Sequence, residues 1–412
     1  MVSLSFFCPK YREELSFGKQ NMRINKRHLI FLKDVFFLAL STFGGPQAHL
    51  AMLFKVLVEK RKYITEDELL ELYALCQILP GPTSTQTITA IGFRMGGANL
   101  AYLTLLVWCF PAVTIMTIAA LCITFLEHNG LSMNFTRFIQ PMAIGFVAYA
   151  AYMISSRVVV TKTGVTLMVI ASFISYIWGT PWILPILLVA GGISTAFKFR
   201  QQPKEEKIPM NIDWANFFLF IGVFFGAALS GAITHSLYVR VFENFYRNGS
   251  LIFGGGQVLI PLMYTEFVDF KNYLTSSEFL SGYALAQAVP GPVFSFCSYI
   301  GALTFRNDGI AGQLLGAFCS AAGIFLPGTF LIFFVIRFWS SLKRYRVVKA
   351  SLEGINAVSS GLVISAAIAM FYQIPAEPLN FIVVFGTFLF LLLDVVAPPY
   401  LILGGLLAGF IV

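Results

Sequence analysis

The chain has 412 residues, of which 57% are hydrophobic, 16% aromatic and only 12% charged. A soluble domain of this size carries about 25% charged residues. The composition therefore excludes a large soluble core and indicates an integral membrane protein. The net charge is +8, but Lys and Arg in a membrane protein mark its cytoplasmic side. We expect the lipid bilayer as a partner and no nucleic acid.

The first segment, residues 1–28, is basic and has no apolar core of its own. Its basic residues are Lys10, Arg12, Lys19, Arg23, Lys26 and Arg27. This pattern predicts a cytoplasmic N-terminal tail and not a cleaved signal peptide.

Two kinds of apolar segment follow. Uninterrupted ones run over 98–126, 138–157, 163–178, 182–197, 211–234, 309–338, 350–372, 379–396 and 399–412, and others, over 29–54, 64–97, 241–264 and 275–306, are broken by FGG or PGP. Helices over 66–79 and 83–97 would be about 21 and 22 Å long, less than the roughly 30 Å of hydrocarbon in a bilayer. We therefore predict an all-α polytopic membrane protein with about nine full spans and four re-entrant, broken-helix segments.

The chain repeats itself. A shift of 210 residues aligns Phe43–Pro82 with Phe253–Pro292 without a gap. Identities fall at Phe43, Gly44, Gly45, Gln47, Val58, Tyr63, Thr65, Glu68, Leu70, Tyr73, Ala74, Leu75, Gln77, Pro80, Gly81 and Pro82. Matches concentrated in Gly, Pro, Gln and Glu indicate two homologous halves, a common plan in transporters.

The basic residues predict that the halves are inverted. With the N-terminus inside, the outer regions hold only Arg137, Arg240, Arg247, Lys271 and Arg306, as the positive-inside rule requires. The basic loop 55–62 then faces the cytoplasm and its mate 265–272 faces out. The predicted units are a tail (1–28), an N-terminal membrane repeat (29–197), a cytoplasmic linker (198–210), a linking transmembrane helix (211–234) and an inverted C-terminal membrane repeat (238–412).

The breaks are the candidate substrate site. A half-helix that starts inside the membrane has unpaired amides and the positive end of its dipole, which together bind anions. Glycines permit close backbone approach or a nest of N–H groups, and Gln side chains add neutral donors. The predicted substrate-binding residues are Gly44, Gly45, Gln47, Gln77, Pro80, Gly81, Pro82, Thr83, Ser84, Thr85, Gly254, Gly255, Gly256, Gln257, Gln287, Pro290, Gly291, Pro292 and Ser295.

Such neutral donors suit a tetrahedral oxyanion better than a metal cation, which takes carboxylates or carbonyls. The alternative is that Pro-Gly-Pro only ends one helix and starts the next, with Ser and Thr as ordinary caps. The duplicated, inverted placement favours binding.

A few charged residues are candidates for substrate attraction or proton coupling, namely Lys33, Asp34, Arg94, Glu68 and Glu278. For Lys33, Arg94 and both glutamates, interfacial snorkelling or capping is the competing interpretation. Thr65 with Glu68, and Thr275 with Glu278, have the spacing of capping boxes, which favours a structural role for both glutamates. Asp394 is expected deep in a span, without an assigned role.

Cysteine and histidine patterns indicate neither a cofactor nor a metal. The six cysteines have no CxxC spacing, and the five in apolar segments are expected to be buried free thiols. The histidines form no i, i+4 pair. No paired-Asp, Ser-His or His-rich constellation of an intramembrane enzyme is recognisable.

The motifs resemble a known family. "FGGPQAHLAML", "YALCQILPGPTST" and "IGFRMGG", followed by "FGGGQVLIPLM" and "GYALAQAVPGPVFSF", are similar to the chromate transporter family in its long, two-domain form. The resemblance covers about 43–111 and 253–327. It implies export of chromate across the cytoplasmic (inner) membrane, driven by the proton-motive force, with sulfate as a chemically similar competitor.

The resemblance places the family's motif positions on Gly44, Gly45, Pro80, Gly81, Pro82, Gly254, Gly255, Gly256, Gln287, Pro290, Gly291 and Pro292. Two departures leave the native oxyanion open: FGGP replaces FGGG in the first copy, and the polar "TSTQT" stands where acidic or amide residues are expected. An oxyanion channel and a sulfate-type transporter remain alternatives, and a homodimer remains open.

Overall fold

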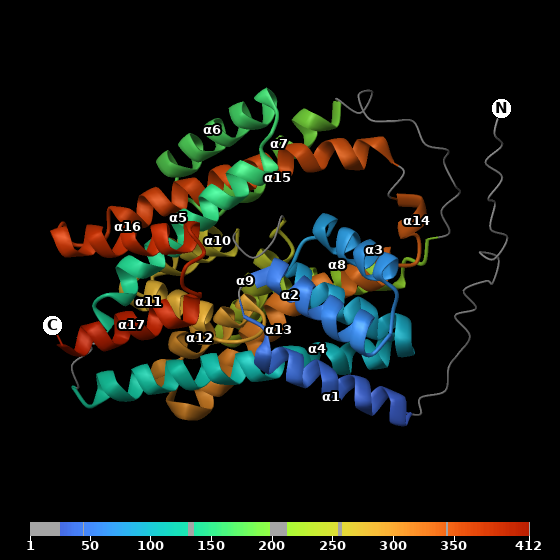
Figure 1. The fold of residues 1–412 in the computed structure, drawn as a ribbon, viewed down its shortest axis with the longest axis horizontal. Helices are drawn as coiled ribbons and strands as arrows, with labels where there is room; N and C mark the ends of the chain where they lie inside the picture. Colours follow the sequence, from blue (N-terminus) through green and yellow to red (C-terminus); the bar gives the residue numbers. More distant parts are fainter. Residues whose placement is uncertain are drawn as a thin grey trace.

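The computed structural model describes residues 25–43, 45–130, 136–197, 212–253, 258–342 and 345–411 (Figure 1). All regular structure in these residues is helical. Most of the predicted tail and the whole of the predicted linker 198–210 lie outside the described residues.

The first half consists of seven α-helices and one π-helix, followed by α8. Their bounds are α1 Lys26–Ser41, α2 Gly45–Leu53, η1 Phe54–Lys60, α3 Glu66–Ile78, α4 Thr83–His128, α5 Ile139–Val158, α6 Lys162–Ile177, α7 Ile183–Ala196 and α8 Ala215–Thr234.

The second half continues in the same order, with short 3₁₀ segments added. Its elements are α9 Leu237–Gly249, α10 Leu259–Tyr264, the π-helix η4 Thr265–Phe270, α11 Ser276–Ala288, η5 Val293–Ser295, α12 Phe296–Thr304, η6 Arg306–Asp308, α13 Gly309–Val335, α14 Trp339–Leu342, α15 Arg346–Phe371, α16 Pro378–Leu392 and α17 Pro398–Ile411.

The helix α4 is two helices joined at a kink. Gly96 and Gly97 have non-helical backbone angles, and Gly97 has φ +71. The kink separates a first half-helix, residues 83–95, from the long helix 98–128. A half-helix ending near residue 97, as the sequence predicts, is confirmed.

Five helical segments of the described chain are long and apolar enough to cross a membrane: Thr83–His128, Ile139–Ser156, Ala215–Thr234, Arg306–Val335 and Arg346–Phe371. Four other predicted spans, α6, α7, α16 and α17, have 16, 14, 15 and 14 residues. They are about 21–24 Å long, so the count of nine full spans stays a prediction. Helices α6 and α7 pack on α15, and α16 packs on α5, in the upper left of Figure 1.

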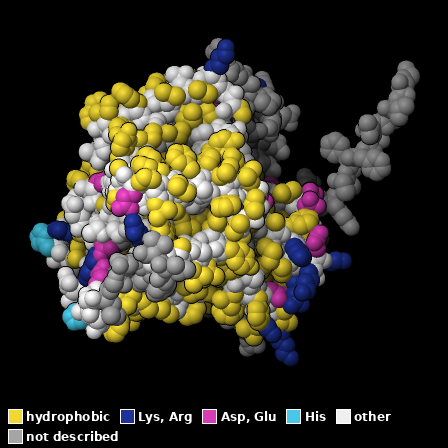
Figure 2. Space-filling view, turned by 60° about the vertical axis from the view of Figure 1, so that its left-hand side comes forward, with side chains coloured by type: hydrophobic (Ala, Val, Ile, Leu, Met, Phe, Trp, Pro, Cys, Tyr) yellow, Lys and Arg dark blue, Asp and Glu magenta, His cyan; other side chains and the backbone are white. Residues whose placement is uncertain are grey.

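The exterior is apolar, as a lipid-facing surface requires. Figure 2 shows apolar side chains over most of one face, with charged side chains toward its left and right margins. Helix α8 contacts mainly α9 and α13, and its exposed side chains include Phe218, Phe225, Leu229 and Ile233. The chain is an integral membrane protein.

The cysteine prediction is only partly correct. The described cysteines are free, and Cys76, Cys109 and Cys297 are buried. Cys319 is half-buried and Cys122 is exposed, because the helix 98–128 turns one side to the exterior. The prediction that Cys122 is buried is therefore wrong.

Candidate substrate site at two helix breaks

The first break is the tip of a helical hairpin. Thr65 and Glu68 form a capping box at the start of α3, with Glu68 N–H donating to Thr65 Oγ1 at 3.3 Å. Glu68 also pairs with Arg94, at the end of the half-helix 83–95, at 3.3 Å. The ion pair joins the two ends of the hairpin, so the chain turns at the break and comes back to the level where it started.

The second break has the same construction. Thr275 and Glu278 form a capping box at the start of α11, and Arg306, after α12, donates to Glu278. The capping role predicted for both glutamates is confirmed. Arg306 was not predicted as the partner of Glu278, although it lies 212 residues after Arg94, close to the repeat shift of 210.

Each break is hydrogen-bonded to the opposite half. Gly81 N–H donates to Ile252 O at 2.7 Å, and Gly291 N–H donates to Thr42 O at 2.9 Å. Thr42 and Ile252 stand just before the two FGG motifs, and the two bonds are equivalent under the 210-residue shift. Each PGP therefore meets the residue that precedes the FGG motif of the other half.

The glycines of the breaks leave no room for a side chain. Gly81 has φ +118, and a Cβ there would lie 2.8 Å from Gln86 Nε2 and 3.4 Å from Gly328 Cα. Gly291 has φ +99, and its Cβ would lie 3.1 Å from Ala112 Cβ. Positive φ and close approach both require glycine.

The first amides of the half-helix after the first break have no acceptor within the helix. Its N-cap, Pro82, has no side-chain acceptor, and Gln86 N–H is the first to donate back, to Pro82 O at 2.9 Å. The amides of Thr83, Ser84 and Thr85 thus lack intrahelical acceptors at the positive end of the dipole. After the second break Pro292 likewise caps without a side chain.

The first turn of this half-helix is polar although it is buried. Thr83, Ser84, Thr85 and Gln86 have exposed fractions of 2–6%. Trp108 Nε1 donates to Thr85 Oγ1 at 3.2 Å, and Gln86 Nε2 donates to Pro80 O at 2.6 Å. The carbonyl oxygen of Trp108 would lie 4.0 Å from a Cβ added to Gly291, so Trp108 lies near both breaks.

His49 is a site residue that the sequence analysis did not select. It lies in α2, is 1% exposed, and its Nδ1 is 2.9 Å from Ser84 Oγ. Its ring meets that of Trp108 edge-on. An ionisable residue directly after an intramembrane FGG break was the available signal.

The remaining predicted substrate residues are more scattered. Ser295, Pro80, Pro82 and Pro292 are buried, Pro290 and Gln287 are half-buried, and Gln77 is exposed. Gln77 and Gln287 bond to tyrosines of their own helices, Tyr73 and Tyr283. Gly45 and Gln47 lie in α2, but their side-chain environments are outside what the structure describes. Gly44, Gly254, Gly255, Gly256 and Gln257 lie outside the described residues.

The other charged candidates lie away from the breaks. Lys33 is exposed on α1 and lies over Phe37. Asp34 is buried and accepts from Arg61 Nη2 and Tyr63 Oη, both at 2.7 Å, which fixes the loop after η1. Asp394 was expected deep in a span, but it is exposed at the turn after α16, with φ +53. That expectation was wrong because α16 ends at Leu392.

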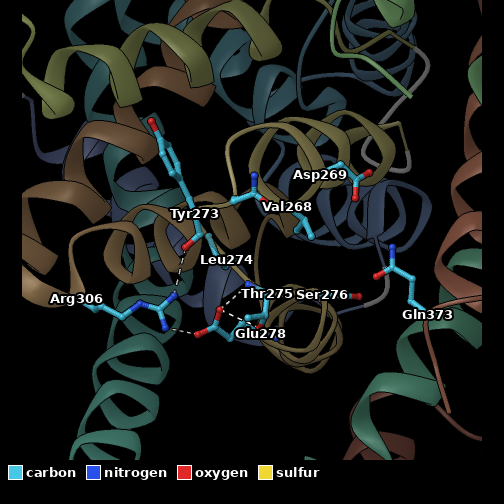
Figure 3. Close-up of a pocket in the computed structure, with 10 residues that line it drawn as sticks. Val268, Asp269, Tyr273, Leu274, Thr275, Ser276, Glu278, Arg306 and Gln373 are labelled. Carbon is cyan, nitrogen blue, oxygen red and sulfur yellow. Dashed lines mark hydrogen bonds and ion pairs between the residues drawn. The ribbon is translucent and has the colours of Figure 1, made fainter. Parts of the chain in front are cut away.

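A pocket of about 580 Å³ lies at the base of the second hairpin (Figure 3). Arg306 and Glu278 line one side, and Asp269 and Gln373 lie on the other. Burial raises the pKa of Asp269 to about 6. Among the predicted site residues only Glu278 lines this pocket, so it is distinct from the breaks.

Comparisons with known proteins agree with the motifs. The chromate transporter family model matches residues 30–196 and 239–410. The chromate transport protein of Cupriavidus metallidurans is 25% identical over 82% of this chain and 81% of its own length. The chromate transport protein of Pseudomonas aeruginosa is 24% identical over 82% and 79%. An uncharacterized transporter of Bacillus subtilis matches 39% of this chain with 83% of its own length, at 24% identity.

No solved structure matches. The matches extend over both halves and over both break motifs, and the relatives named for a function are transport proteins, not enzymes. The chain belongs to the chromate transporter family.

Proposed function

We propose that the protein is a secondary active transporter that exports chromate, or a related tetrahedral oxyanion, across the cytoplasmic membrane with the proton-motive force. The oxyanion binds at the half-helix N-termini beside the paired PGP and FGG breaks. The observation that carries this proposal is the reciprocal pair of hydrogen bonds, Gly81 to Ile252 and Gly291 to Thr42. They place both half-helix starts in the protein core.

Neutral donors favour an oxyanion at this place. The first turn after Pro82 offers amides and hydroxyls, and in the part of the chain that the structure describes no ion pair touches Thr83, Ser84 or Thr85. Unpaired amides at membrane depth are tolerated only where they line a polar site or are buried in protein. Donors without a full charge hold an anion and also let it leave.

Shared features of the halves support two inverted repeats. Both contain a π-helix between the FGG motif and the PGP break, and a capping box at the hairpin base. Lys62 and Asn272, one shift apart, both have positive φ, at 53 and 52. Inverted repeats with broken helices at their interface are a recurrent transporter plan. We retain the boundaries 29–197 and 238–412 for the repeats, a cytoplasmic N-terminus and a homodimer as parts of this proposal.

A flux assay in everted membrane vesicles tests the function. Labelled chromate should accumulate in vesicles that contain the protein, saturate with concentration, and stop accumulating when an uncoupler is added. Vesicles without the protein are the control. Linear, uncoupler-insensitive flux would identify the alternative, an oxyanion channel. Preference for labelled sulfate over chromate would identify a sulfate-type transporter.

A further inference from the structure

His49 is an ionisable side chain held in the core next to the first break. Its Nδ1 faces Ser84 Oγ, while Nε2 is buried without a hydrogen-bond partner among the described residues. Leaving a buried polar atom unpaired destabilises a protein. A partner that arrives with the substrate would explain why the ring is kept there.

Among the described residues, no charged side chain is found in contact with His49. The groups that face it are the Ser84 hydroxyl and the Trp108 ring, both on α4. The elements packed against α2 are η1 and α4, and their charged residues nearest in sequence, Lys55, Glu59, Lys60 and Arg94, are exposed. A proton on His49 would therefore bring a full positive charge next to Ser84, in the first turn after this break.

The second break has no such group. The residue one repeat shift from His49 is Leu259, which is fully buried. The ionisable residue is therefore present in only one of two otherwise duplicated breaks. The structure of the repeat itself does not require a histidine at this position, since leucine occupies it in the second half.

We infer that His49 is the ionisable residue of the oxyanion site and that it binds a proton together with the anion. This inference rests on the proposed function. In the protonated ring Nδ1–H donates to Ser84 Oγ and Nε2–H donates to an oxygen of the dianion. One proton is taken up on binding and returned on release, so a doubly charged oxyanion crosses with a net charge of −1. The electrical part of the proton-motive force then drives its export.

Chromate binding to the purified full-length protein in detergent tests the inference. The wild type and His49→Gln are compared at each pH between about 5.5 and 8.5, a range that brackets the ordinary imidazole pKa. Because chromate has the same protonation in both samples, the affinity ratio reports the protein alone. We expect the wild type to bind at least about tenfold more tightly at low pH, with the ratio falling steadily as the pH rises.

Proton uptake gives a second readout. In weak buffer at about pH 8, where chromate is a dianion, the wild type should take up one proton per chromate bound and His49→Gln none. His128→Gln is the matched control, because His128 is exposed at the end of α4. If His49→Gln does not fold, Ser84→Ala should shift the loss of affinity to lower pH, since it removes the Nδ1 acceptor.

The outcomes are distinguishable. A wild type that binds no chromate contradicts the proposed function itself. Binding with the same pH profile in wild type and His49→Gln, or a ratio that stays constant with pH, overturns the role of His49 while leaving the site in place. The constant ratio would mean that His49 acts as a neutral donor.

Discussion

At the scale of single residues, the two PGP glycines decide whether the breaks can form. Gly81 and Gly291 combine positive φ with atoms that would lie within 3.1 Å of an added Cβ. Their amides are used to bind the opposite half and are not available to substrate. In the first half, the amides without an intrahelical acceptor belong to residues 83–85. The glycines therefore position the break, and the first turn of the half-helix is the part that can bind the anion.

Gly81→Val and Gly291→Val should each lower chromate transport by at least about tenfold. A β-branched residue at positive φ costs roughly 1–3 kcal/mol, and here it also displaces Gln86 or Ala112. Flux in everted vesicles, normalised to the amount of inserted protein, measures the effect. Gly130→Val is the matched control, because Gly130 also has positive φ, at +64, but has nothing within 4 Å. Normal transport in both break variants would refute the placement of the site.

Sequence predicted some of these residues and missed others for identifiable reasons. Gly81 and Gly291 were predicted because the repeated PGP motif itself indicates a backbone conformation that favours glycine. The Ser84–His49 contact was missed because it joins residues 35 apart across a break, and the repeat does not duplicate it. Gln77 shows the opposite error. It was predicted as a binding residue because it is part of the repeat, but its side chain is exposed.

At the scale of elements, the hairpin bases are closed by ion pairs. Glu278 is mostly buried and binds Arg306 and the Thr275 backbone. Burial raises its pKa, but the hydrogen bonds from Arg306 and Thr275 outweigh burial, so the net pKa lies below the usual value. The folded protein therefore binds this proton less readily than the unfolded chain does, and the pair stabilises the fold above about pH 4.

Glu278→Gln should lower stability by roughly 1.5–3 kcal/mol at neutral pH, the range for a hydrogen bond to a charged group. The gap to the wild type should close as the pH falls below about 4, where the wild-type carboxylate is protonated. Melting temperature in detergent as a function of pH measures it. Glu377→Gln removes the exposed pair with Arg137 and should cost less than about 1 kcal/mol. An equal gap at all pH values would contradict the assignment.

Element lengths show where sequence reasoning succeeds. The half-helices were predicted because proline and glycine stop a helix by backbone sterics, which are local. The number of full crossings was not settled by the apolar runs. Helices α7 and α17, with 14 residues each, are shorter than the hydrocarbon core of a bilayer. Helix α7 packs on α15 and α17 contacts α5, and no local sequence pattern encodes such contacts between distant segments.

At the scale of the whole molecule, the proposed inversion of the two halves predicts that equivalent loops lie on opposite sides of the membrane. Lys62 and Asn272 are exposed and share the same left-handed backbone. Lys62→Cys should react with a membrane-impermeant maleimide in everted vesicles, and Asn272→Cys in intact cells. Peptide mapping by mass spectrometry separates these sites from the native cysteines. Reaction of both from one side would mean that the halves are parallel.

The bond from Gly81 to Ile252 also sets an order of events during synthesis. The first hairpin leaves the ribosome long before residue 252 has been made, and the partner of Gly291, Thr42, must wait equally long for the second hairpin. Contacts this distant in sequence form late and slowly. The first half must therefore stay in the membrane with an unfinished tip, and the two halves complete each other in one final step.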